Sequence, residues 1–178
     1  ADFDGDEMNL HAPQSSQTRI ELSKLARVQS QIISPRMNSP IIVLVQDTLL
    51  GSYRITNDNV YFTEKEMMEM MITIKSFDGN LPEPEINDKE YKRWSGRQLI
   101  TLILPPINLN NANNSYENNP SKLNMIKIKD GHLLQGRLDK KIINAGTSGL
   151  IHTIFNDYGE KRCQQFLDNI QDIITKYL

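Results

Sequence analysis

Three carboxylates stand at alternate positions near the start of the chain: Asp2, Asp4 and Asp6, with Gly5 between the last two. On a straight strand the outer two would lie roughly 13 Å apart, since each residue advances about 3.3 Å. One metal ion can therefore bind all three only if the backbone curls, and glycine permits such a turn. Carboxylate oxygens suit Mg²⁺, which keeps open coordination positions for substrate phosphates. The pattern predicts a magnesium site for phosphoryl or nucleotidyl transfer.

A calcium loop and a phosphatase nucleophile motif are the alternatives for this segment. An EF-hand counted from Asp2 requires glycine at its sixth position and glutamate at its twelfth, but Glu7 and Pro13 occupy those places. The nucleophile motif of haloacid-dehalogenase-type phosphatases resembles residues 2–5. That family continues with threonine or valine where this chain has Asp6, and the chain carries no downstream acidic pair to complete its metal site. Both alternatives are less favoured.

The whole of residues 1–9, Ala-Asp-Phe-Asp-Gly-Asp-Glu-Met-Asn, followed by His11 and by Pro-Gln at 13–14, resembles the metal-binding loop of the largest subunit of multisubunit DNA-directed RNA polymerase. Further motifs follow in the order found in that family, in its eukaryotic or large-DNA-virus form. They are Ser-Pro-Arg-Met-Asn-Ser-Pro at 34–40, Val-Gln-Asp-Thr-Leu-Leu-Gly at 45–51, Trp-Ser-Gly-Arg-Gln at 94–98, Leu-Pro at 104–105, Asp-Gly at 130–131, Lys-Lys at 140–141 and Gly-Leu-Ile-His at 149–152.

The resemblance implies a mixed α+β fold in two parts. Residues 1–16 would be the C-terminal end of the catalytic domain, carrying the active-site loop of a double-psi β-barrel. Residues 17–178 would form a largely helical pore domain with a small β-hairpin region. A metal loop has to be held from both sides, so we expect the chain to be a fragment of a longer polypeptide, running from the active-site loop through the pore.

For function, the resemblance implies template-directed RNA synthesis from ribonucleoside triphosphates. Asp2, Asp4 and Asp6 would hold a resident Mg²⁺ and a second Mg²⁺ would arrive with the nucleotide, as in two-metal nucleotidyl transfer. Lys140 and Lys141 would contact phosphate or RNA in the pore. We expect the fragment alone to be inactive. The alternative is a non-catalytic remnant, or truncated paralogue, that keeps the pore fold.

The implied partners are the second-largest subunit, smaller subunits, DNA template, RNA transcript and nucleoside triphosphates, with a transcript-cleavage factor at the pore. The implied location is intracellular: the nucleus, or the cytoplasm or virion of a large DNA virus. The viral option comes from the enrichment in asparagine, lysine and isoleucine, which is typical of an A+T-rich genome. No apolar run approaches the length of a membrane span, so no membrane contact is expected.

Composition fits an ordinary globular protein of 178 residues, with 38% hydrophobic and 24% charged residues and a net charge of −2. The single cysteine excludes an internal disulfide and is typical of a reducing compartment. The three histidines and this cysteine lack the spacing of a zinc site, so no zinc is expected. Charge is uneven: residues 58–90 carry nine acids and three bases, whereas residues 121–141 carry six bases and two acids. The basic segment is either a solvated face or a surface near phosphates.

In the first half of the chain, a capping box at 18–21 predicts a helix to about residue 29 with an apolar stripe. Residues 34–40 read as a loop. The apolar run 41–45 fits a buried strand or a helix, and the resemblance favours a helix continuing to Leu50 and ending at Gly51. A second capping box at 63–66 opens a helix whose apolar face should be core: Met67, Met70, Met71 and Ile74.

In the second half, Ser95 should cap a short helix that ends before the prolines at 105–106. Residues 108–120 contain seven asparagines and read as a loop. The alternation at 126–135 around Asp-Gly predicts a β-hairpin. Gly159 should separate two helices, the second with a core-facing stripe that includes Cys163. His152 should be structural and Cys163 core.

Overall fold

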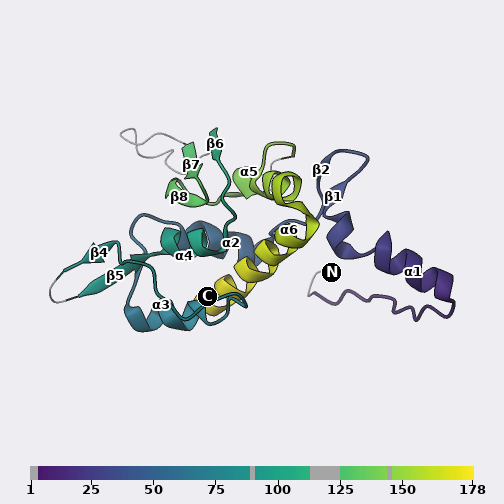
Figure 1. The fold of residues 1–178 in the computed structure, drawn as a ribbon, viewed down its shortest axis with the longest axis horizontal. Helices are drawn as coiled ribbons and strands as arrows, with labels where there is room; N and C mark the ends of the chain where they lie inside the picture. Colours follow the sequence, from purple (N-terminus) through teal and green to yellow (C-terminus); the bar gives the residue numbers. More distant parts are fainter. Residues whose placement is uncertain (1–3, 89–90, 113–124, 144–145) are drawn as a thin grey trace.

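A computed structural model describes residues 4–88, 91–112, 125–143 and 146–178 (Figure 1). Helices alternate with short strands along the chain. In order these are α1 (Ser16–Lys24), the 3₁₀ turn η1 (Val28–Gln31), β1 (Ile33–Ser34), β2 (Ser39–Pro40), α2 (Gln46–Ile55), β3 (Tyr61–Phe62), α3 (Glu64–Met71), β4 (Ile86–Asn87), β5 (Lys92–Ser95), α4 (Gly96–Ile103), β6 (Leu109–Ala112), β7 (Met125–Lys129), β8 (His132–Gln135), α5 (Lys140–Ile143) and α6 (Leu150–Tyr177).

The long C-terminal helix α6 runs through the middle of the molecule (Figure 1). It packs against α2, α3, α4, α5, η1 and β2. Its inward face carries the stripe predicted from the sequence, and that face is buried: Cys163, Phe166, Ile170, Ile173 and Ile174. The predicted interruption is also confirmed, because Gly159 has φ +78° and ψ 176°, which is not helical.

Two glycines let α2 approach its neighbours closely. A Cβ on Gly51 would overlap the Ile174 side chain of α6, and a Cβ on Gly96 would overlap the carbonyl oxygen of Ile55. The prediction that Gly51 ends its helix is therefore wrong: α2 continues to Ile55, and Gly51 is there because α6 leaves no room for a side chain. The apolar run before it is also not helical, since residues 43–45 lie outside regular structure and α2 begins at Gln46.

Two helix starts are fixed locally, as predicted. Thr63 caps α3 and Ser95 caps α4, each in a complete capping box with the glutamate or glutamine three residues on. The backbone N–H of Thr63 donates to Glu66 and is the main cause of the lowered pKa of that carboxyl. The methionine face of α3 is core, as expected, with Met67 fully buried.

The capping box predicted at Thr18 is wrong. Ser15 caps α1, with its hydroxyl accepting from the Thr18 N–H at 3.1 Å, and the helix ends at Lys24. Its apolar residues do not form a buried stripe in this chain, since Leu22 and Leu25 are exposed. A local hydrogen bond therefore sets where α1 begins. The apolar side chains of α1 could be buried only against a surface that the described residues do not supply.

Three small antiparallel sheets complete the fold: β1–β2, β3–β5–β4 and β6–β7–β8. The predicted hairpin is confirmed as β7 and β8, joined by Asp130 (φ +50°) and Gly131 (φ +76°), the pair of positive φ angles that a two-residue turn requires. Two loop predictions are wrong in part. Residues 34–40 include the pair β1–β2, and the asparagine-rich segment begins as strand β6 because Leu109 is buried opposite Ile128. Residues 113–120 of that segment lie outside the described residues.

The predicted mixed α+β class, helical with small hairpins, is confirmed. Within the described ranges, none of the helices combines the length and the apolar character that a bilayer crossing demands.

Replacing Gly96 by alanine tests the close contact between α2 and α4. The added methyl group would meet the Ile55 carbonyl oxygen, a backbone atom that cannot rotate away, so we expect a loss of about 1–3 kcal/mol in the free energy of unfolding. Gly146→Ala is the matched control, because the nearest atom to its Cβ would be 3.9 Å away, and we expect a change within about 0.5 kcal/mol. Urea denaturation measures both, and equal stability of the two variants would contradict the assigned contact.

Candidate active site

The aspartate loop lies at the start of an exposed arm. Asp2 lies outside the described residues; Asp4 and Gly5 form a turn, and Asp4 and Asp6 are both exposed. Gly5 has φ +113°, a conformation that L side chains rarely adopt. The described residues contain no group of three or more His, Cys, Asp or Glu side chains placed to hold a metal. The three-aspartate site therefore stays a prediction, with Gly5 in the backbone conformation that such a loop uses.

The donor set fits the expected ion. The two described carboxylates flank a turn, face solvent and offer only oxygen atoms, which are the ligands that Mg²⁺ takes in proteins. Carboxylates brought together without a cation would repel each other, so an ion bound between them would relieve that repulsion.

The arm is joined to the body by polar contacts to α6. Residues 4–28 are all exposed, and the first buried side chain is Ile32. Arg27 forms an ion pair with Glu160, and the Ser30 hydroxyl donates to the same carboxylate at 2.6 Å. These contacts span more than 120 residues of sequence. Sequence reasoning missed these contacts because no local pattern around Arg27, Ser30 or Glu160 indicates that the two segments meet.

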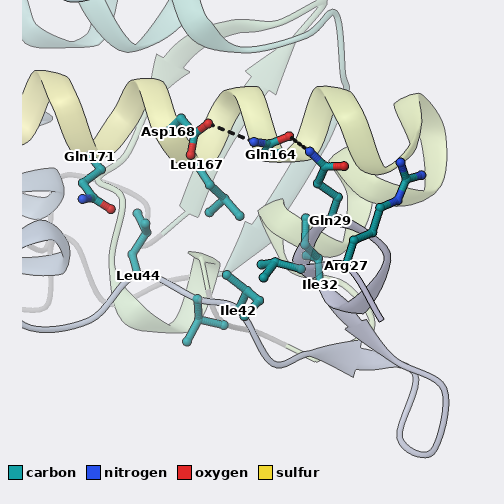
Figure 2. Close-up of a pocket in the computed structure, with 11 residues that line it drawn as sticks. Arg27, Gln29, Ile32, Ile42, Leu44, Gln164, Leu167, Asp168 and Gln171 are labelled. Atoms are coloured by element: carbon teal, nitrogen blue, oxygen red, sulfur yellow. Dashed lines mark hydrogen bonds between the residues drawn. The ribbon is translucent and has the colours of Figure 1, made fainter. Parts of the chain in front are cut away.

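A groove lies between this end of the arm and α6 (Figure 2). Its volume is about 340 Å³. Gln29 Nε2 donates to Gln164 Oε1 at 2.5 Å, and Gln164 Nε2 donates to Asp168 at 3.3 Å, so a row of polar groups crosses one side. Apolar side chains line the rest: Val28, Ile32, Ile42, Val43, Leu44 and Leu167.

The segment just before the candidate basic pair, at Arg137 and Leu138, is held by residues at the end of α2 and just after it. Both Lys140 and Lys141 are exposed, while the next two residues of α5 are buried. Upstream, Arg137 lies over the Tyr53 ring, with 5.1 Å between the guanidinium carbon and the ring centroid, and donates to Asn57 at 3.0 Å. The Leu138 N–H donates to the buried Thr56 hydroxyl at 3.0 Å. The fold thus fixes the start of α5 but leaves the lysine side chains in solvent, and Figure 1 places α5 apart from the aspartate arm.

His152 is structural, as predicted. It is 6% exposed. Asn156 Nδ2 lies 3.0 Å from His152 Nδ1, and Nε2 lies 3.4 Å from Asn38 Oδ1. The ring nitrogens of His152 therefore lie within hydrogen-bond distance of two asparagine side chains, Asn156 and Asn38. The ring thereby ties α6 to the turn between β1 and β2.

Cys163 is core, also as predicted. Its side chain is fully buried, and the thiol donates weakly to the Ile151 carbonyl at 3.7 Å. Burial raises the pKa of the Cys163 thiol from 9.0 to about 12. A thiolate nucleophile needs a lowered pKa, so this cysteine takes no part in chemistry.

The chain belongs to the family of RNA polymerase largest subunits. Residues 31–178 match the family described as RNA polymerase Rpb1, domain 3, and residues 1–28 match RNA polymerase Rpb1, domain 2. The predicted resemblance is confirmed. The boundary predicted after residue 16 stays a prediction.

Two relatives illustrate the match. The chain is 36% identical over 178 residues to the DNA-directed RNA polymerase II subunits RPB1-A and RPB1-B of Trypanosoma brucei brucei. The alignment covers 100% of this chain and 10% of each relative, so the chain spans a small part of the length of the curated relatives it matches.

The pKa of Cys163 predicts alkaline destabilisation. Below pH 9 the thiol is protonated in both folded and unfolded chains. Between about pH 9 and 12 only the unfolded chain loses the proton, so stability falls as pH rises, by roughly 1 kcal/mol per pH unit from this group. We expect Cys163→Ala to show a shallower fall in unfolding free energy between about pH 9 and 11. Equal slopes for the two proteins would contradict the raised pKa.

Proposed function

We propose that this chain is a segment of the catalytic largest subunit of a DNA-directed RNA polymerase, which extends RNA on a DNA template from ribonucleoside triphosphates. The observation that carries the proposal is the intact aspartate loop directly preceding a segment that matches RNA polymerase Rpb1, domain 3. A non-catalytic remnant is less well supported, because all three aspartates are present and carboxylates clustered without a metal destabilise one another.

In this proposal Asp2, Asp4 and Asp6 hold the resident Mg²⁺. Bound there, the ion would supply Lewis-acid activation of the RNA 3′ hydroxyl and charge stabilisation, the roles metals take in nucleotidyl transfer. The chain itself would provide three negative charges and a turn at Gly5, which would have to bring alternate carboxylates toward one another. No covalent intermediate is required, so the contribution of the chain would be positioning and electrostatics.

The proposal extends to partners and location. The enzyme would assemble with the second-largest and smaller subunits, bind template DNA, transcript and nucleotides with a second Mg²⁺, and receive a transcript-cleavage factor at the pore. It would act in the nucleus, or in the cytoplasm or virion of a large DNA virus. The viral source rests on asparagine, lysine and isoleucine content alone. Co-purification of a tagged chain from its source cells, followed by identification of the bound subunits, tests the assembly.

The central test is Asp4→Ala in the assembled polymerase. Loss of a metal ligand should remove several kcal/mol of transition-state stabilisation, on the order of a thousandfold in elongation rate, with assembly intact. The matched control is Asp172→Asn, an exposed carboxylate near the end of α6, which should elongate normally. Near-normal transcript synthesis by the Asp4→Ala enzyme would refute the catalytic assignment.

The role of Lys140 and Lys141 is tested separately. If they contact phosphate in the pore, the double alanine variant should raise the apparent KM for nucleoside triphosphates or weaken retention of the transcript about two- to tenfold, because each exposed charge pair contributes up to about 1 kcal/mol. The rate at saturating nucleotide should not change. The control is Lys176→Ala, which removes an exposed lysine of α6. Equal effects of the two variants would show that Lys140 and Lys141 do not contact phosphate in the pore.

A further inference from the structure

The outer face of the β6–β7–β8 sheet is basic. Alternation along β7 buries Ile126 and Ile128 and exposes Lys127 and Lys129. Across the sheet, Lys127 lies opposite Asn110 on one side and Gln135 on the other, and Lys129 lies opposite His132. The register places two cations, two amides and an imidazole on one surface.

No aspartate or glutamate occurs in these three strands or in α5. The chain as a whole has a net charge of −2, whereas residues 121–141 carry six bases and two acids. Within the described residues the ion pairs join Arg27 to Glu160, Lys65 to Glu69 and Arg97 to Asp58, and none involves Lys127 or Lys129. Carboxylates lie at the margins of the sheet, with Asp130 in the turn after Lys129 and with Glu83 and Glu85 in the pocket that His132 and Leu134 also line.

The face is held rigidly from behind. The Leu133 N–H donates to the Thr101 hydroxyl of α4 at 3.1 Å, and the Asp130 N–H donates to Asn108 Oδ1 at 2.9 Å. Gly131 packs against the Pro105 carbonyl, where a Cβ would lie only 2.7 Å from its oxygen. The strands are therefore fixed in register on α4, which gives the two lysine side chains a fixed base.

We propose that this sheet face binds single-stranded RNA through its phosphates. Lys127 and Lys129 leave the strand about 6.6 Å apart on the same side, since each residue advances about 3.3 Å, a spacing that lets each cation address a different phosphate of an extended strand. The choice of RNA as the polyanion rests on the proposed function.

Two neighbouring side chains favour a nucleic acid over an acidic peptide. His132 and Leu134 are exposed on the same strand, on either side of the buried Leu133. A histidine ring can stack on an unpaired base, and a leucine offers apolar surface beside it. The face carries no bidentate arginine aimed at base edges, so the binding is independent of sequence.

The basic pair on α5 follows the sheet after a short connection. Four residues separate Gln135 from Lys140, which limits the distance between their Cα atoms to roughly 18 Å. A strand lying along β7 can therefore reach Lys140 and Lys141 within a few nucleotides.

The experiment measures binding of a fluorescent oligouridylate to the 178-residue chain by anisotropy over a range of salt concentrations. Removing two phosphate contacts in Lys127→Gln/Lys129→Gln should make the slope of log K against log salt shallower by about 1.4, at 0.7 per contact. The charge reversal Lys127→Glu/Lys129→Glu should weaken binding at low salt by at least about tenfold. Circular dichroism and urea denaturation verify that each variant is folded.

The matched control is Lys75→Glu/Lys176→Glu, which reverses two exposed lysines elsewhere on the surface. An equal loss in the control would mean that net charge alone matters and would overturn the proposal, as would unchanged binding in both Lys127/Lys129 variants. Binding of oligoglutamate but not of RNA at this face would overturn it in favour of an acidic protein. Nucleotide addition plays no part in the assay, so Asp4→Ala should bind RNA like the parent chain, and failure of either proposal is seen independently of the other.

Discussion

Burial of the inner face of α6 is the constraint on which the rest of this structure depends. Helices α2, α3, α4 and α5, the turn η1 and strand β2 all pack on it. The close approach of α2 requires glycine at position 51, and α4 meets the end of α2 through Gly96. Helix α4 in turn supports the β6–β7–β8 sheet. The position of the solvent-facing side of this sheet therefore depends on the buried apolar face of α6, on which α4 packs.

The features that the sequence predicted well are those decided by neighbours in the chain. The two capping boxes, the methionine face of α3 and the hairpin turn at Asp130-Gly131 each depend on residues within four positions of one another. One error was local, since Ser15 and not Thr18 caps α1, and the others occurred where a distant partner decides. Gly51 looked like a helix end, yet it is a contact point with Ile174, and Leu109 became part of a strand because Ile128 lies opposite it.

The candidate site divides in the same way. The motif at residues 1–9 identified the carboxylates, and Gly5 has the left-handed φ that a tight loop needs. Whether the carboxylates converge is not decided locally, since the described part of the arm that carries them buries nothing before Ile32. The contacts that tie the arm to α6 join Arg27 and Ser30 to Glu160, and such polar pairs leave no periodic trace in a sequence. The basic sheet face, by contrast, was visible as an excess of lysine, but its geometry required the register of β6, β7 and β8.

The break at Gly159 has a mechanical consequence. A helix interrupted by a glycine usually bends freely, yet here the residues around the break are tied down on three sides. The Tyr158 hydroxyl donates to the Pro106 carbonyl at 2.7 Å, Glu160 holds Arg27, and Arg162 donates to the Ile103 carbonyl at 2.9 Å. These contacts restrict bending at Gly159. They also connect the residues before η1, through α6, to the end of α4, which packs on strand β8.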